Sequence, residues 1–518
     1  MLFHSYIFVF AFLPVCLIGY YGLLQWGKKG QNSQPARVWL LLSSLVFYAW
    51  LNPVYLILLT ASLLFNYAIY CLIRRNAAGG QKAIFRGKLP LILGITGNLG
   101  LLFYFKYADF FLENMNSLLQ LSIPLRNLAL PLGISFFTFQ QISFLVDSDR
   151  GEVEPCSVLD YSLYLTYFPK LVEGPITSQK LLLPQLKQIG KHPFDWERFY
   201  RSTMLFAFGM MKKVLIADVL GGAADYGYAN IGSLASLDAI LVMLSYTLQL
   251  YFDFSGYCDM ALGISGMLGI DLPLNFDSPY KASNIIAFWK RWHITLSQFF
   301  MKYVYIPLGG NRRGRGRMYL NLLIIFFLSG LWHGAGWNFI LWGMLHGVLY
   351  VITRFVMHGC DKRATQSETV QSGATGSHLQ KLLHQVTHML SILGTFLYVN
   401  IAWVFFRAAS LQEAWELLTI MLSGRWQRVN YQLAACFNLD ELWYAIKVFH
   451  LDKWQYGHYI LMTVFLAAVL VIVFGMDNAG QFTKKMRPGI WTTILMGGAF
   501  AWCVLHFANV STFLYVNF

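Results

Sequence analysis

Charged residues are scarce in this chain of 518 residues: they make up 12% of it, whereas 57% of the residues are hydrophobic. Soluble domains contain about 25% charged residues, so a deficit of this size excludes a string of packed soluble domains. Several apolar runs approach the roughly 20 residues that cross a bilayer as a helix. The composition therefore predicts an all-α polytopic integral membrane protein.

Cysteine pairs and several common site motifs are also missing. The seven cysteines are scattered without a CxxC pair, and we interpret them as buried thiols. Without HExxH or paired-cysteine spacing we expect no metal site, and without GxSxG we do not expect a serine hydrolase. The two halves of many secondary transporters repeat each other in sequence, but the two halves of this chain do not.

The net charge of +14 comes from 39 Lys and Arg against 25 Asp and Glu. Such a balance can indicate nucleic acid, but here the basic residues cluster in short loops between apolar runs, which is typical of cytoplasmic loops. Loops 25–37 and 74–88 are basic, whereas the turn at Asn52 and Pro53 is not. We predict that these loops are cytoplasmic, that the N-terminus is periplasmic, and that no nucleic acid is bound.

The apolar segments fall into three parts of what we predict to be one membrane domain, 1–518. The N-terminal part, 1–129, has spans at His4–Leu24, Val38–Leu51, Val54–Ile73 and Leu89–Tyr107. The C-terminal part, 388–518, has spans at Met389–Phe406, Tyr459–Phe474 and Ile490–Phe507, and an amphipathic interfacial helix at Leu411–Leu422. Residues 361–377 are small and polar, which predicts a flexible loop.

The central part, 130–347, carries polar residues in apolar surroundings. Pro131–Val146 contains Gln140 and Gln141, which are costly to expose to lipid, so this segment should line the protein interior. Tyr164–Ile176 contains two prolines and two charged residues, and we interpret it as re-entrant or interfacial. Phe206–Val219 and Ala239–Phe252 are further apolar helices.

Five ionisable residues of this central part stand out: Asp253, Asp259, His293, His333 and His346. Ionisable groups at membrane depth are costly and are usually functional. An imidazole is the natural general base for a hydroxyl near neutral pH. We therefore consider His293 and His333 as catalytic candidates, His346 as a residue that at most supports them from behind, and the two aspartates as structural residues or as support for the histidines.

The three histidines differ in their local sequence. His293 lies in Ile285–Tyr303, which has the periodicity of one interfacial helix, so a functional and a boundary role are both open. His333 follows an apolar run and is flanked by Trp332 and Gly334, which favours a functional role. On a continuous helix His346 would point about 140° away from His333, unless the helix breaks near Gly334.

A basic, glycine-rich segment, GGNRRGRGR, covers 309–317. We interpret it as a cytoplasmic loop; the alternative is that it also attracts an anionic acyl donor or lipid headgroups.

Six segments of the chain, in order, resemble the signature blocks of the membrane-bound O-acyltransferases, in particular their bacterial alginate-acetylation branch. They are LPLGISFFTFQQISFLVD, YFPKLVEGPI, FDFSGYCDMALGISGMLGIDLPLNFDSPY, FWKRWHITLSQFF, YIPLGGNRRG and LSGLWHGAGWNFILWGMLHG. The resemblance implies a multi-helix bundle, with re-entrant and interfacial helices, around a tunnel. It also implies that His333 is the catalytic histidine, that His293 is the second signature position, and that Trp292 and Trp332 support them.

The resemblance further implies an acetyltransferase of the bacterial inner membrane. Its donor would be acetyl-coenzyme A or a derived acetyl donor, with no tightly bound cofactor. Its partners would be periplasmic or membrane-anchored acetyltransferases and an exported polysaccharide such as alginate, within membrane lipid. The alternative function is a transporter that moves an acylated or lipid-linked molecule without covalent chemistry.

Overall fold

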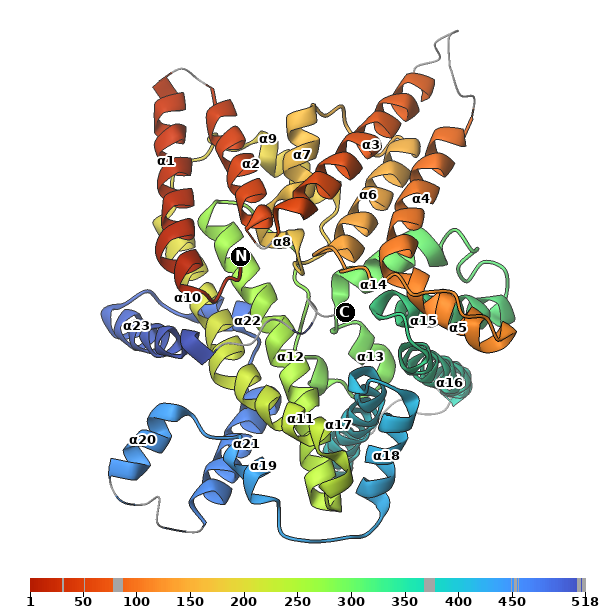
Figure 1. Cartoon of the computed structure of the whole chain (residues 1–518), viewed down its shortest axis with the longest axis vertical. Coiled ribbons are helices and arrows are strands. Elements are labelled where there is room, and N and C mark those ends of the chain that lie inside the picture. The colour runs from red at the N-terminus through yellow and green to blue at the C-terminus, as the bar shows by residue number, and fades with distance from the viewer. Residues whose placement is uncertain are drawn as a thin grey trace. The chain divides into compact units, whose positions relative to one another are not determined.

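The computed structural model describes residues 1–29, 32–50, 52–77, 87–367, 378–448, 450, 454, 456–509 and 514. Within these ranges every regular element is a helix (Figure 1). Among the described residues, seven helices are long and apolar enough to cross a membrane: Phe8–Gly27, Pro53–Ala77, Leu89–Leu119, Ser236–Met267, Trp337–His358, Gln380–Arg407 and Gly457–Gly475. The predicted all-α, multi-pass architecture is confirmed.

The chain contains two compact units. The first comprises Met1–Val214, Phe254–Leu274 and Ala479–Phe518, and the second comprises Leu215–Asp253 and Asn275–Asn478. Helix α12 (Ser236–Met267) contributes to both. The predicted central part, 130–347, therefore supplies residues to each unit.

The other helices of the first unit are α1 (Leu13–Lys29), α2 (Gln34–Ala49), α3 (Pro53–Ala77), α4 (Leu89–Leu102), α5 (Ala108–Leu119), α6 (Ile134–Asp149), α7 (Val158–Thr166), α8 (Phe168–Leu171), α9 (Gln179–Lys187), α10 (Trp196–Met211), α22 (Ala479–Lys485) and α23 (Ile490–Leu505). Helices α3, α4 and α6 pack together, as Figure 1 shows.

Helix α6 lines the interior of the first unit, as predicted. Gln140 and Gln141 are fully buried. Gln140 accepts a hydrogen bond from the buried Lys170, and Gln141 accepts one from Ser62 at 3.1 Å. The segment Tyr164–Ile176 follows the predicted irregular course, because α7 ends at Thr166 and α8 is a single turn.

The other helices of the second unit are α11 (Asp218–Ala229), α13 (Ile285–Trp289), α14 (Ile294–Phe300), α15 (Arg315–His333), α16 (Trp337–Ser367), α17 (His378–Arg407), α18 (Leu411–Leu422), α19 (Tyr431–Ala435), α20 (Asp440–Val448) and α21 (Gly457–Gly475). Helix α16 packs on both α15 and α17 (Figure 1). The bounds of α18 are those predicted, because its apolar residues keep helical spacing up to a serine cap at Ser410.

Two sequence predictions are corrected here. Ile285–Tyr303 is not one helix: α13 ends at Trp289, and α14 begins at Ile294. The predicted polar loop, 361–377, begins as helix, since α16 continues to Ser367. Residues 368–377 of that loop lie outside the described residues.

Several helices contain a π-helical turn, in which each N–H group bonds to the carbonyl group five residues earlier. Such turns occur at Phe8–Phe12, Phe103–Tyr107, Lys212–Ala217 and Met301–Tyr305. In the last of these, the Ile306 N–H donates to the Met301 carbonyl oxygen at 3.1 Å.

Candidate active site

Helices α15 and α16 form a closely packed hairpin that ends at His333. A Cβ atom on Gly330 would collide with the Phe339 carbonyl oxygen, and one on Gly343 would collide with the Phe326 carbonyl oxygen. Glycine at these positions lets the two backbones approach. His333 is the last residue of α15, where the chain turns into α16.

The His333 side chain packs among aromatic rings and is 3% exposed. Its ring centroid lies 4.9 Å from that of Trp332, 5.0 Å from that of Trp342 and 5.1 Å from that of Phe406. These contacts fix the plane of the imidazole and exclude bulk water from it.

His293 occupies the interruption between α13 and α14. Its backbone φ is 43°, in the left-handed region, which costs energy for a residue with a side chain and is characteristic of functional sites. Two hydrogen bonds from the main chain hold the interruption: the Ile294 N–H donates to the Asn275 carbonyl oxygen, and the Asp277 N–H donates to the Arg291 carbonyl oxygen, both at 3.0 Å. Because these partners are distant in sequence, local periodicity does not reveal the break.

The Asn275 side chain selects one tautomer of His293. Its Oδ1 atom accepts hydrogen bonds from the Thr295 N–H at 3.2 Å and the Thr295 hydroxyl at 3.0 Å, and lies 3.1 Å from Nδ1 of His293. A backbone N–H can only donate, so the Asn275 atom is an oxygen and Nδ1 must carry the proton. Burial lowers the pKa of His293 to about 3, so the ring is neutral and its lone pair is on Nε2.

Trp332 brings the two predicted catalytic histidines to one place. Its ring centroid lies 6.1 Å from that of His293 and 4.9 Å from that of His333. Trp292 is buried beside His293 in the chain and packs against Phe276 at 5.0 Å. Both tryptophans thus pack close to a predicted catalytic histidine, and their supporting role stays a prediction.

His346 lies closer to this site than a continuous helix would allow. Helix geometry requires a break near Gly334 for His346 to face the site, and α15 does end at His333 before α16 begins at Trp337. The Trp342 ring contacts His333 at 5.0 Å and His346 at 5.1 Å. His346 is fully buried, and among the described residues neither of its ring nitrogens has a hydrogen-bond partner.

The two aspartates occupy different surroundings. Asp259 forms an ion pair with Lys212 at 2.5 Å within the first unit, so its buried charge has an opposite partner. Asp253 is buried in the part of α12 that belongs to the second unit.

The sequence predictions missed Asn275, Trp342 and Phe406. Asn275 belongs to the motif LPLNFDSPY, but it precedes His293 by 18 residues, and no spacing rule links an amide to an imidazole at that distance. Phe406 lies in the predicted span Met389–Phe406 and Trp342 in the segment LSGLWHGAGWNFILWGMLHG, and aromatic side chains carry no specific signal in such apolar surroundings.

Comparisons with known proteins agree with this architecture. A family model described as the membrane-bound O-acyltransferase family matches residues 8–376. A peptidoglycan O-acetyltransferase of Helicobacter pylori is 40% identical over 447 residues, covering 82% of this chain and 80% of that protein. A probable alginate O-acetylase, AlgI, of Pseudomonas aeruginosa is 38% identical over 433 residues, covering 82% and 76%.

A more distant relative is a teichoic acid D-alanyltransferase of Bacillus subtilis, which is 28% identical over 243 residues and covers 45% of this chain and 61% of that protein. All three relatives are named for transfer of a group, so the transporter alternative is not favoured. This chain belongs to the membrane-bound O-acyltransferase family and is a multi-pass membrane acyltransferase.

Proposed function

We propose that this enzyme transfers an acetyl group from a cytoplasmic donor toward a glycan of the bacterial cell envelope, with His333 as the general base. The observation that carries the proposal is the meeting of His333 and a tautomer-fixed His293 at one buried indole, Trp332. The two relatives with the highest identities given above are named for O-acetylation of peptidoglycan and of alginate, which supports an acetyl group and a glycan acceptor.

In the proposed reaction, His333 removes the proton from an attacking hydroxyl group. The hydroxyl oxygen then bonds to the acetyl carbonyl carbon while the bond from that carbon to the donor's sulfur breaks. The sulfur leaves as a thiolate and takes up the proton from His333. The donor is acetyl-coenzyme A or an acetyl thioester derived from it, and His293 orients the reacting groups through its Nε2 side.

The acceptor is either the glycan itself or a hydroxyl group of a periplasmic or membrane-anchored acetyltransferase that passes the acetyl group on. Transfer of labelled acetyl from acetyl-coenzyme A by the purified protein in lipid nanodiscs, with and without a candidate partner, tests the reaction. Label in the glycan or partner that requires His333 supports it. Transport of an acetylated molecule without bond exchange would contradict it.

The direction of transfer depends on the orientation of the chain in the inner membrane. Basic residues cluster near Arg313, whereas Arg126, after α5, is balanced by Asp109 and Glu113 of α5 itself, which continues the helix where the sequence predicted a loop. A reporter fused near Arg313 should therefore behave as cytoplasmic, and one near Asn116 as periplasmic. Reversed signals would overturn the proposed periplasmic N-terminus and the cytoplasmic entry of the donor.

A further inference from the structure

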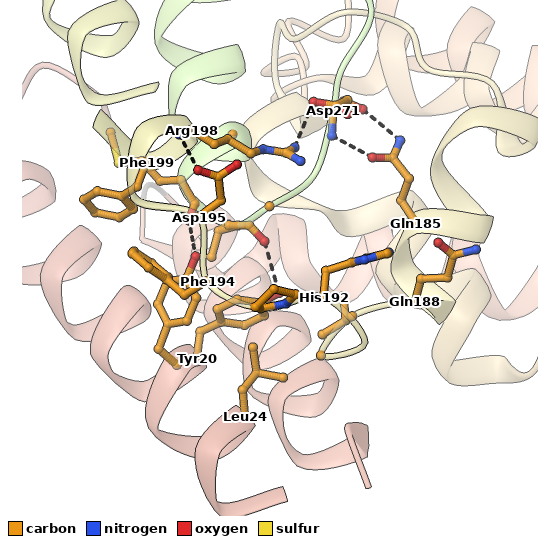
Figure 2. A pocket seen from close by; sticks show the side chains of 18 of the residues that line it. Tyr20, Leu24, Gln185, Gln188, His192, Phe194, Asp195, Arg198, Phe199 and Asp271 are labelled. Atoms are coloured by element: carbon orange, nitrogen blue, oxygen red, sulfur yellow. Dashed lines mark hydrogen bonds and ion pairs between the residues drawn. The ribbon is translucent and has the colours of Figure 1, made fainter. Parts of the chain in front are cut away.

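The first unit contains a cavity of about 1060 Å³. None of the residues described above around His293 and His333 lines it. Its walls come from the end of α1, from α9, from the segment leading into α10, and from the end of α12 (Figure 2). The residues lining it all belong to the first unit. Nothing in the proposed acyl transfer uses it.

Hydrogen bonds fix the walls of this cavity. The Tyr20 hydroxyl donates to the Leu268 carbonyl oxygen at 3.1 Å, and the Tyr21 hydroxyl donates to the Met267 carbonyl oxygen at 2.5 Å. Gln185 bonds both the N–H and the carbonyl group of Asp271, at 2.7 and 3.1 Å. Because the walls are already fixed, the protein loses little conformational entropy when a ligand binds in the cavity.

The charged groups of the cavity have both signs. Arg198 donates to the Asp271 carboxylate at 2.8 Å, and Asp195 accepts the Arg198 N–H at 3.0 Å as the N-cap of α10 (Figure 2). The lining thus holds one guanidinium and two carboxylates. A ligand with several phosphates, such as a coenzyme A, is disfavoured there, because the carboxylates would repel it.

Aromatic rings line the same cavity as Asp195. The Phe194 ring centroid lies 4.9 Å from that of Tyr21 and 4.7 Å from that of Trp196. Aromatic faces and a carboxylate together are the groups that recognise an organic ammonium ion. The guanidinium of Arg198 has five donors and can bind a phosphate while it remains paired with Asp271.

The cavity lies at one end of a candidate membrane span. Tyr20, Tyr21 and Leu24 belong to the last two turns of the candidate span Phe8–Gly27. Trp26 and Trp196 are 68% and 77% exposed, as aromatic side chains at a membrane interface are. The end of a span lies near the lipid headgroups, so a membrane lipid is the ligand that we expect there.

We propose that this cavity binds the zwitterionic headgroup of an aminophospholipid of the phosphatidylethanolamine class. The ammonium group lies against Asp195 and the rings of Phe194 and Trp196, and the phosphodiester lies against Arg198. The site holds α1, α10 and the end of α12 together at the membrane surface. It is independent of the acyl-transfer reaction, so either can fail without the other.

The test is the retention of lipid by the purified full chain, measured by native mass spectrometry after detergent exchange from nanodiscs that contain equal amounts of phosphatidylethanolamine and phosphatidylglycerol. Asp195→Asn is the decisive variant, because asparagine caps a helix as well as aspartate but carries no charge. It should lower the retention of phosphatidylethanolamine by about fivefold at an unchanged melting temperature. Arg198→Gln should lower it as well.

Glu197→Gln is the matched control. It removes the same charge two residues away, but Glu197 pairs with Arg201 and does not line the cavity. Preferential retention of phosphatidylethanolamine by the wild type and by Glu197→Gln, but not by Asp195→Asn, supports the site. Equal retention of both lipids by the wild type, or equal losses in Asp195→Asn and Glu197→Gln, would overturn it.

Discussion

His293 and His333 share Trp332 as a neighbour, but different contacts position their rings. His293 bonds to a side-chain oxygen that also holds Thr295, and its backbone adopts a left-handed conformation. His333 ends a helix and packs against three aromatic rings. The hydrogen bond to a fixed acceptor selects one tautomer of His293, and the three aromatic rings fix the plane of the His333 imidazole.

This difference suits two roles. A residue that orients a substrate gains from a fixed tautomer, because its lone pair then always points the same way. A general base must gain and lose a proton in each cycle. The packing around His333 would hold the ring through that cycle, which supports the proposal of proton transfer at His333 and orientation by His293.

The largest effect should come from His333→Gln. The amide keeps hydrogen-bonding capacity but cannot act as a base, so the rate of acetyl transfer should fall by about a hundred- to ten-thousand-fold. Membrane levels of the protein should stay close to those of the wild type. Acetyl transfer at the wild-type rate would remove His333 from the role of base.

Asn275→Ala should produce the next largest effect. It leaves the buried donors of His293 and Thr295 unpaired, which should destabilise the fold by about 1–3 kcal/mol. It also frees the His293 ring, and misplacement of a catalytic group can lower the rate by up to about a hundredfold. Melting temperature and initial rate measure the two effects.

Thr295→Val is the matched control for Asn275→Ala. It removes one donor to the same oxygen but leaves Nδ1 of His293 paired. It should therefore keep most of the activity. A rate as low as that of Asn275→Ala would show that the threonine hydroxyl, rather than the imidazole contact, is what matters.

Variants of His346 test, with a smaller expected effect, whether this residue has a packing role or a catalytic role. Because its ring nitrogens have no hydrogen-bond partner among the described residues, His346→Phe should match or exceed the wild-type stability and keep activity within about threefold. His346→Ala should lose about 3 kcal/mol, because it leaves a cavity among Trp289, Trp342 and Tyr398. A stable but inactive His346→Phe protein would mean that His346 contacts the reacting groups.

The smallest effect concerns the dependence of stability on pH. The pKa of His293 is lowered from 6.5 to about 3 by burial, so between these values the unfolded chain binds a proton that the folded chain does not. Stability therefore falls as the pH drops below 6.5. Asparagine tolerates a left-handed backbone and does not titrate, so His293→Asn should show a smaller loss of melting temperature between pH 7 and pH 5. An equal loss would assign the acid sensitivity to other groups.

Sequence was a good guide where the signal is local. Helix α18 has its predicted bounds, because an amphipathic pattern and a serine cap are both read within a few residues. The break after His333 was foreseen as a condition, because the glycines that allow it are adjacent to it. The polar interior of α6 followed from glutamines that lipid would not tolerate.

Sequence-based prediction failed where a residue distant in sequence determines the local structure. The interruption at His293 depends on bonds to Asn275 and Asp277, and nothing in the periodicity of Ile285–Tyr303 shows them. The aromatic packing around His333 draws on Phe406 from α17, a helix far along the chain. Aromatic residues in a membrane protein are common, so their sequence positions alone do not indicate which of them meet.

The π-helical turn at Met301–Tyr305 has a consequence for how the family diversifies. A π turn contains one residue more than the α-helical turn that it replaces, so it behaves as a single-residue insertion that a helix absorbs without breaking. Relatives that lack this turn should be one residue shorter between the equivalents of His293 and the glycines at 309 and 310. Alignment gaps of one residue inside a helix would then mark the ancestry of each branch.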